Sequence, residues 1–376
     1  MSEIPVLILA LVAALFVGFF LLTRRSMPYV FCNATLSAWE ARLLSESRLA
    51  ELANAPSPEA FLSALEETDY RNEVLELRGS GAPDPVEFER ALRENAGARY
   101  REMLSMLPEE RRGTVARIVS MTDIWNLKAI ISMIASGVPP EKRAKELLPS
   151  PTMSGDRLEM LASAKTLDEL LEYLRGSEYG QAIRDAMAEY EKKGLRAVLL
   201  AVDRCYWQSL WRDVMAKRGQ RKTLMQMVGY ELDSLNARLV LRLKQEGAPP
   251  DEIYANLVRP SHELTEAMLR AMVTAGDLVS AVNMIHLTVV GRVLLEASRD
   301  IGERGALAAE EALEKGRMRL FRWLGMTKFF TIAPALSYIA QKEAEVRRLR
   351  EIYRTKFDGA RQAPVEKPSG GIVVEA

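Results

Sequence analysis

The stretch SPEAFLSALEETDY, from Ser57 to Tyr70, recurs 109 residues later as TLDELLEYLRGSEY, from Thr166 to Tyr179. Each copy opens on a hydroxyl residue suited to a helix N-cap, carries an acid in the first turn, and continues with apolar residues at i, i+1 and i+4. The pattern therefore predicts a short amphipathic helix in each copy. Because so short a helix cannot bury its apolar face alone, the repeat indicates a duplicated helical domain.

A second pair of matching stretches supports the same period. TDIWNLKAIISMIASGVPP begins at Thr122, and LDSLNARLVLRLKQEGAPP begins at Leu232. We interpret the aspartate in each as the cap that opens a helix, and the Gly and Pro-Pro as the signals that stop it. The aspartate and the asparagine three residues later keep a spacing of 110 between the two stretches: Asp123 and Asn126, Asp233 and Asn236.

A weaker relative of this opening, YVFCNA, begins at Tyr29 and contains Asn33. We therefore expect three related helical modules, at residues 26–120, 121–230 and 231–358, the last with a C-terminal helix. The remaining residues, 359–376, are rich in Pro and Gly, which predicts a disordered tail.

The composition favours an all-α fold, because Ala, Leu, Glu, Arg and Met dominate and alternating β-branched runs are missing. The 51 basic and 51 acidic residues balance, so no net field attracts nucleic acid. Cys32 and Cys205 are interpreted as buried free thiols. The two histidines, His262 and His286, are too far apart in sequence to suggest a metal site.

The N-terminal region, residues 1–25, contains an uncharged apolar run from Ile4 to Leu22. As a helix this run is about 28 Å long, close to the hydrocarbon thickness of a bilayer. Arg24 and Arg25 follow it, which favours a single-pass anchor in the cell membrane with the body on the cytoplasmic side. A signal peptide would have its basic residues first, and a soluble core helix would have a polar face. The residues chosen to represent the anchor are Ile4, Leu9, Leu15, Phe19 and Leu22.

Only six residues, Thr23 to Pro28, connect this anchor to the body, with a reach of roughly 20 Å when extended. At the other end of the chain, a regular amphipathic helix is expected from Pro334 to about Phe357. We expect Glu343 and Glu351 to pair with Arg347 along its surface at i,i+4 spacing. Its apolar stripe comprises Leu336, Ile339, Val346, Leu349 and Tyr353.

Motifs that carry chemistry are missing from the sequence. There is no Walker loop, no G-x-S-x-G elbow and no Gly-rich dinucleotide turn, and the basic turn at Gly219 lacks phosphate-loop spacing. The aromatic cluster Tyr206, Trp207 and Trp211 is interpreted as helix-packing core. We therefore expect a non-catalytic protein without a cofactor or a small-molecule substrate.

The motifs resemble those of the C subunit of archaeal A-type and bacterial V/A-type ATP synthases, whose equivalent in the eukaryotic V-ATPase is the d subunit. The resemblance rests on Y-V-x-x-N-A at Tyr29, L-x-x-T-D-Y ending at Tyr70, the two D-x-x-N…G-x-P-P stretches, and S-Y-I-A-Q-K-E-A-E-V-R-R-L-R from Ser337. An N-terminal transmembrane segment is not typical of that family. The positions that match the motifs, with structural or partner-contact roles, are Tyr29, Asn33, Tyr70, Asp123, Asn126, Tyr179, Asp233, Asn236, Glu345 and Arg347.

The resemblance implies a funnel of three similar helical domains around a pseudo-threefold axis. Such a funnel sits on the cytoplasmic face of the membrane rotor ring and receives the foot of the central shaft. The implied partners are the shaft subunits, the proteolipid subunits of the ring, and membrane lipid. An alternative that the sequence leaves open is a membrane-anchored helical adaptor or tether of another complex.

Overall fold

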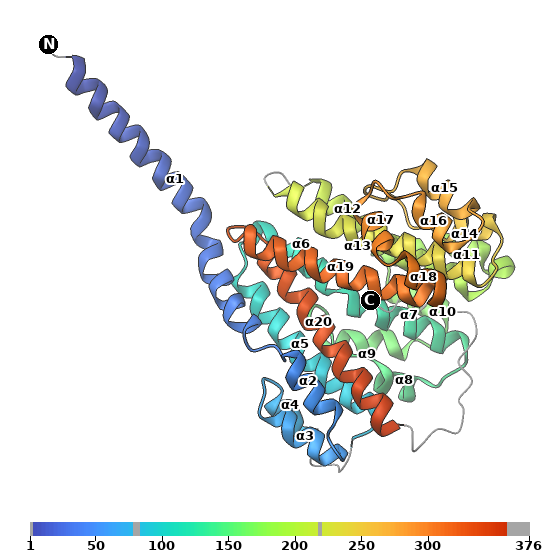
Figure 1. Ribbon diagram of the computed structural model, residues 1–376. Coiled ribbons are helices and arrows are strands. Elements are labelled where there is room, and N and C mark those ends of the chain that lie inside the picture. Colours follow the sequence, from blue (N-terminus) through green and yellow to red (C-terminus); the bar gives the residue numbers. More distant parts are fainter. Residues whose placement is uncertain (1–2, 78–82, 217–219, 359–376) are drawn as a thin grey trace.

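The computed structural model describes residues 3–77, 83–216 and 220–358, and all the regular structure in these ranges is helical (Figure 1). The prediction of an all-α fold is therefore confirmed. The expected disordered tail and the turn at Gly219 lie outside the described residues. The first part of the chain forms α1 (Glu3–Glu40), α2 (Glu46–Ala53), α3 (Pro58–Glu66), α4 (Arg71–Leu77) and α5 (Pro85–Met106).

The middle of the chain forms seven further helices, several of them short. They are α6 (Glu109–Val119), α7 (Met121–Ala135), α8 (Pro140–Glu146), α9 (Gly155–Ser163), α10 (Leu167–Tyr173), α11 (Glu178–Lys193) and α12 (Leu195–Ala216). The break between α11 and α12 falls at Gly194, whose φ of +64° is a conformation that side chains with a Cβ rarely adopt.

The last part of the chain begins with a long buried helix and ends with the C-terminal helix. The elements are α13 (Arg221–Gln245), α14 (Pro250–Asn256), α15 (Glu266–Thr274), α16 (Leu278–Asn283), α17 (Val289–Glu296), α18 (Ser298–Arg304), α19 (Ala306–Thr327), α20 (Ala333–Tyr353) and a π-helical turn, η2 (Arg354–Asp358).

Pairs of N-caps twelve residues apart recur three times along the chain. Ser57 caps α3 and Thr166 caps α10, as the repeat predicts, and each side chain accepts from the backbone N–H three residues later. Asp277 caps α16 in the same way, so a third copy exists that sequence comparison missed. It was missed because an aspartate replaces the hydroxyl and smaller apolar residues follow. The three residues that cap the preceding helices are Ser45, Ser154 and Thr265.

The predicted capping role of Asp123 and Asp233 is wrong. Asp233 lies in the middle of α13, which begins at Arg221, and its carboxylate accepts from the backbone N–H groups of His262 and Glu263 at 2.8 and 2.7 Å. Asp123 lies in the first turn of α7 and accepts from the Thr152 hydroxyl. Each aspartate therefore fastens a distant loop to its helix.

The C-terminal helix α20 connects the two ends of the chain, because it packs against α19 on one side and against α5, α1 and α2 on others. Its predicted stripe is confirmed as buried: Leu336, Ile339, Val346, Leu349 and Tyr353 all lie in the core. The aromatic ring of Tyr353 stacks on Phe88 of α5 with a centroid distance of 4.2 Å.

The predicted i,i+4 pairs of α20 are wrong, because Glu343 faces inward and the exposed Glu351 lies 3.8 Å from Arg348. Glu343 accepts from Arg93 at 2.5 Å and from the Tyr100 hydroxyl at 2.7 Å, both on α5. Arg347 lies 3.5 Å from Glu314 of α19. The i,i+4 spacing takes no account of charges on other helices. Because α20 is surrounded by helices, Glu343 bonds to Arg93 and Arg347 lies near Glu314 instead.

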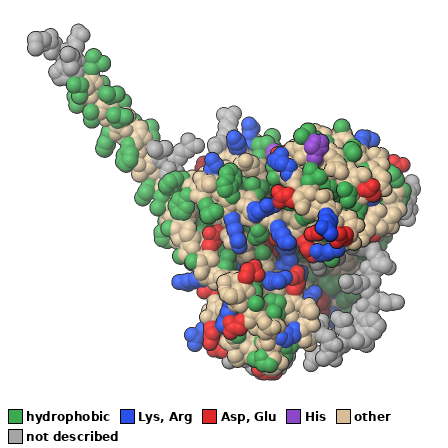
Figure 2. All heavy atoms as spheres, in the orientation of Figure 1, with side chains coloured by type: hydrophobic (Ala, Val, Ile, Leu, Met, Phe, Trp, Pro, Cys, Tyr) green, Lys and Arg blue, Asp and Glu red, His purple; other side chains and the backbone are tan. Residues whose placement is uncertain are grey.

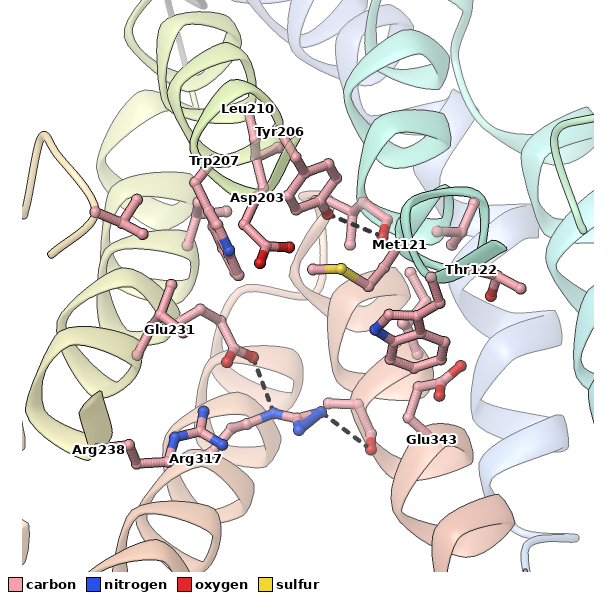
Figure 3. A pocket seen from close by; sticks show the side chains of 18 of the residues that line it. Met121, Thr122, Asp203, Tyr206, Trp207, Leu210, Glu231, Arg238, Arg317 and Glu343 are labelled. Carbon is pink, nitrogen blue, oxygen red and sulfur yellow. Dashed lines mark hydrogen bonds and ion pairs between the residues drawn. The ribbon is translucent and has the colours of Figure 1, made fainter. Parts of the chain in front are cut away.

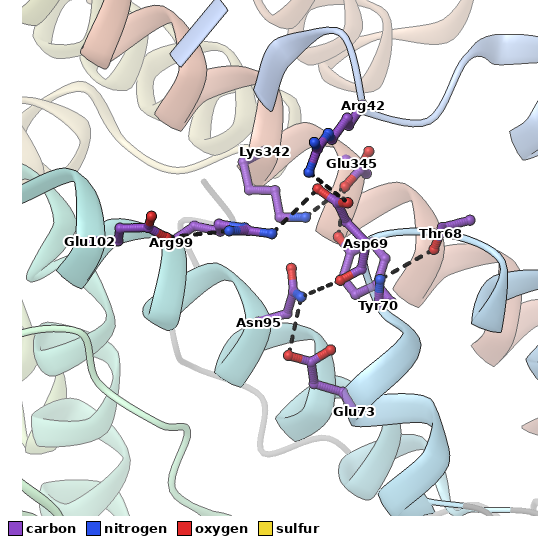
Figure 4. A network of polar contacts seen from close by, with 10 residues as sticks. All are labelled: Arg42, Thr68, Asp69, Tyr70, Glu73, Asn95, Arg99, Glu102, Lys342 and Glu345. Atoms are coloured by element: carbon purple, nitrogen blue, oxygen red, sulfur yellow. Dashed lines mark hydrogen bonds and ion pairs between the residues drawn. The ribbon is translucent and has the colours of Figure 1, made fainter. Parts of the chain in front are cut away.

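Another acid of α20, the buried Glu345, joins three segments (Figure 4). Its carboxylate accepts from the Tyr70 hydroxyl at 2.7 Å, from Lys342 at 2.9 Å and from the Leu44 backbone N–H at 2.5 Å. The Lys342 ammonium also lies 4.0 Å from the centroid of the Tyr70 ring. Satisfied buried networks of this kind fix one arrangement of the helices that share them.

We expect Leu349→Ala to lower the free energy of unfolding by about 2–5 kcal/mol, because the side chain is fully buried and its removal leaves a cavity. Arg348→Ala, one residue away on the exposed side of α20, should change it by less than about 0.5 kcal/mol. Denaturant unfolding of the two purified variants measures both values. Equal losses would contradict the assignment of the buried face.

The ion pair of Glu343 predicts a pH dependence of stability. Burial alone raises the pKa of Glu343, but Arg93, the Tyr100 hydrogen bond and Arg317 outweigh it and hold the pKa below its usual 4.5. Its contribution to stability is therefore complete above the ordinary carboxyl pKa and is lost as the pH falls below about 4.5.

We expect Glu343→Gln to destabilise the protein at pH 7 by about 3–5 kcal/mol, because the buried Arg93 loses its counter-charge. The difference from the unmodified chain should shrink below the carboxyl pKa. Glu351→Gln, at an exposed position of the same helix, is the control and should follow the unmodified chain. Stability curves from pH 3 to pH 7 test this, and a constant difference across the range would refute the assignment.

Candidate functional site

A cavity of about 160 Å³ lies where helices from distant parts of the chain meet (Figure 3). Its lining comes from α6, α7, α12, α13, α19 and α20, together with Asn256 of α14 and Val258, which follows it. Because these helices come from separate parts of the chain, the cavity exists only in the folded arrangement of all of them.

Most of the cavity wall is apolar and rich in aromatic side chains. Tyr206 and Trp207 of α12 lie edge to face with ring centroids 5.2 Å apart, and Trp125 of α7 also lines the cavity. The Tyr206 hydroxyl donates to the Ile118 carbonyl at 3.3 Å, and burial raises its pKa far above the ordinary value, so the phenol stays neutral. The remaining apolar wall includes Leu199, Leu235, Leu239, Phe321 and Ile339.

The predicted role of the aromatic cluster as packing core is confirmed for two of its members. Tyr206 and Trp211 are buried. Trp207 is only half-buried, and it lines the cavity. Its ring therefore has a face that a partner can contact.

Charged side chains in the wall form pairs with one another. Lys128 of α7 contacts Asp203 of α12 at 2.7 Å, and burial raises the pKa of Asp203 against the opposing effect of Lys128. Arg317 of α19 contacts Glu231 of α13 at 2.9 Å and Glu314 at 3.2 Å. The wall therefore offers apolar surface between compensated charges, which suits an apolar partner group better than a charged one.

The chemistry of a catalytic or metal centre is not evident in this lining. The acids named above each have a cationic neighbour, and no histidine lines the cavity. Within the part of the chain that the structure describes, no three His, Cys, Asp or Glu side chains are grouped closely enough to hold a metal ion.

Two of the three motif asparagines make equivalent backbone contacts from different helices, and the third makes a different pair. Asn126 of α7 donates to the Leu148 carbonyl at 2.7 Å and accepts from its N–H at 2.9 Å. Asn236 of α13 makes the same two bonds to Val258, each at 2.9 Å. Both therefore hold the chain that follows the next short helix. The third, Asn33 of α1, donates to the carbonyl of Thr331 at 3.1 Å and to that of Phe329.

The other motif residues also lie in the framework and do not line the cavity. Tyr29 and Tyr70 are buried, Tyr179 is half-buried at the start of α11, and Glu345 and Arg347 belong to the α20 contacts described above. Motif matching therefore identified residues that hold the helices together. It missed the cavity lining, whose one sequence signal was the Tyr206–Trp207 pair.

The predicted anchor is the free part of α1, which extends away from the body (Figures 1 and 2). Leu9, Leu15 and Phe19 are 71%, 66% and 68% exposed, whereas the side chains of Ile4 and Leu22 lie outside the described residues. By length and composition the stretch Glu109–Ala135 is also apolar enough to cross a membrane, but 44% of its most apolar part is buried. It comprises α6 and α7, so we interpret it as core.

Comparison with known proteins places the chain in a family. The family model described as ATP synthase (C/AC39) subunit matches residues 32–366. The A-type ATP synthase C subunit of Methanocaldococcus jannaschii is 27% identical over 88% of this chain and 83% of its own length. The corresponding protein of Pyrococcus abyssi is 27% identical over 91% and 90%, and that of Methanothermobacter thermautotrophicus is 28% identical over 88% and 84%.

These matches span the helical body and include every motif from Asn33 onward on which the resemblance rests. The resemblance inferred from the sequence is thus confirmed, and the chain belongs to the ATP synthase (C/AC39) subunit family.

Proposed function

We propose that this chain is the non-catalytic central-stalk socket of a rotary A/V-type ATP synthase, which links the central shaft to the membrane rotor ring and transmits torque. The observation that carries the proposal is the cavity formed jointly by α7, α12, α13, α19 and α20. A site built from so many helices passes a force applied at one wall to the whole body.

The cavity wall indicates what the foot of the shaft presents. Aromatic and aliphatic side chains dominate, and the charges beside them are paired, as Lys128 is with Asp203. An apolar side chain at the end of a shaft helix fits a cavity of about 160 Å³ and contacts the rings of Trp125 and Trp207 without separating these pairs. A charged tip would lose its hydration and find few free partners.

A body that transmits torque must resist deformation. The walls of the cavity continue into α20, whose acids Glu343 and Glu345 are bonded to Arg93 and Tyr70 near the other end of the chain. Close-packed interiors of this kind have low compressibility and transmit strain.

We further propose three related modules at residues 26–120, 121–230 and 231–358, arranged as a funnel with pseudo-threefold symmetry. The recurring N-caps at Ser57, Thr166 and Asp277 support this division, as do the 22-residue helices α5, α12 and α19, which recur at nearly the same period. α20, which belongs to the last of these modules, also packs on α1, α2 and α5 of the first.

The membrane attachment is assigned to α1. We propose that residues 4–22 span the bilayer once, that Arg24 and Arg25 mark the cytoplasmic side, and that the body stands on that side. The exposed apolar surface of Leu9, Leu15 and Phe19 supports this topology, because such a surface is costly in water.

We expect Trp207→Ala to weaken binding of the isolated shaft subunits to the purified chain by about tenfold or more, as the loss of an aromatic anchor at an interface does. Trp323→Ala is the matched control, because this tryptophan is 52% exposed on α19 and does not line the cavity. Titration calorimetry gives both affinities, and a melting curve of each variant checks that it is folded. Equal affinities would refute the socket.

We expect the body from Met27 onward to bind no ATP at micromolar concentrations, because the sequence lacks a phosphate-binding loop. Equilibrium dialysis with labelled nucleotide measures this. Saturable binding in that range would contradict a non-catalytic role.

A further inference from the structure

The apolar segment and the body are parts of one unbroken helix. The sequence suggested an extended connector over Thr23–Pro28, but α1 continues through it from Glu3 to Glu40. As a helix these six residues rise only about 9 Å, and although Pro28 cannot donate a backbone hydrogen bond, the chain is helical on both sides of it. The orientation of the apolar segment is therefore set by the body.

The body end of α1 is held firmly. Asn33 is fastened to the turn after α19, and Trp39 packs on Tyr338 of α20 with ring centroids 5.4 Å apart. Glu40 accepts from Gln341 at 2.8 Å. The buried side chains on this part of α1 also include Tyr29, Cys32 and Leu36. When the body turns, α1 must turn with it.

The free part of α1 has no polar face. Leu9, Leu11, Val12 and Val17 point to different sides of the helix, and each is 54–71% exposed. No charged or hydrogen-bonding side chain lies between Ile4 and Leu22 with which a specific helix partner could pair. Such a surface is suited to lipid or to an apolar wall that surrounds it.

We propose that α1 crosses the membrane inside the lumen of the rotor ring, enclosed by the ring helices. This inference rests on the proposed rotor function. A rotor works against a stationary membrane partner at the outer face of the ring, and a rigidly attached helix outside the ring would strike that partner in each revolution. Inside the ring every neighbour turns with the helix, so no clash arises, even where α1 lies off the axis.

A second observation concerns the base of α1. Phe330, 58% exposed, lies in the turn that Asn33 binds, and Phe31 of α1 is 69% exposed. Phe31 stands nine residues beyond Leu22, or about 14 Å along the helix, which exceeds the roughly 5–8 Å of a head-group layer. These exposed rings therefore lie above the lipid, at a height where the cytoplasmic rim of a ring can cover them.

The test is disulfide crosslinking in membranes that contain the assembled complex, with Ala13→Cys in the full chain. Single cysteines are placed at lumen-facing positions of the ring protein, at its outward-facing positions, or on the stationary membrane partner. Ser47→Cys, exposed on α2 of the body, is the matched control. The chain with only its native Cys32 and Cys205 gives the background.

We expect Ala13→Cys to couple to lumen-facing positions alone and Ser47→Cys to couple to none. ATP-driven ion pumping should remain within about twofold of its value before crosslinking, because the two linked parts turn together. Coupling to outward-facing positions or to the stationary partner, or no coupling at any position, would overturn the lumen placement.

Co-purification of the same variants with the ring and shaft proteins distinguishes a wrong placement of α1 from a wrong assignment of the function. If the chain stays with both while the crosslinks go elsewhere, the placement of α1 is wrong and the stalk assignment stands. If the chain co-purifies with neither the ring nor the shaft proteins, the proposed function itself is wrong.

Discussion

Two acids of α20, the half-buried Glu343 and the buried Glu345, form the constraint on which the rest of the structure depends. Glu343 and Glu345 are separated by two positions, yet both are bonded to segments that lie about 250 or more residues earlier in the sequence, through Arg93 and Tyr70. Burying two carboxylates is costly unless each finds hydrogen bonds and a counter-charge. Their partners are present only when α1 to α5 have closed around α20, so these contacts specify one way of bringing the two ends of the chain together.

Local signals in the sequence predicted local structure well. The N-caps Ser57 and Thr166 and the buried stripe of α20 were predicted because capping and helical periodicity depend on a few neighbouring residues. Asp233 was misread because the start of α13 lies twelve residues earlier, where Gln220 makes no side-chain cap and leaves no recognisable signal. Its backbone partners, His262 and Glu263, lie about thirty residues later and could not be deduced from spacing.

The cavity could not be predicted from the sequence for a related reason. Trp125, Trp207 and Arg317 meet there from three helices, and no spacing connects them. A half-buried tryptophan follows the same helical periodicity as a core tryptophan. The sequence alone therefore could not distinguish Trp207, which lines the cavity, from a residue of the packed core. The motif residues, by contrast, have fixed sequence separations because they fasten the same loop in each repeat, as Asn126 and Asn236 do.

Helix α20 lies between the cavity and α1, the two parts of the structure to which a function is assigned. Leu336, Ile339 and Glu343 of α20 line the cavity, whereas Tyr338 and Gln341 contact α1 on another side. A load applied in the cavity therefore reaches α1 across the width of a single packed helix. If the shaft enters the cavity and α1 stands inside the ring, α20 is the shortest mechanical path between them, and its ion pairs to α5 prevent it from rolling under that load.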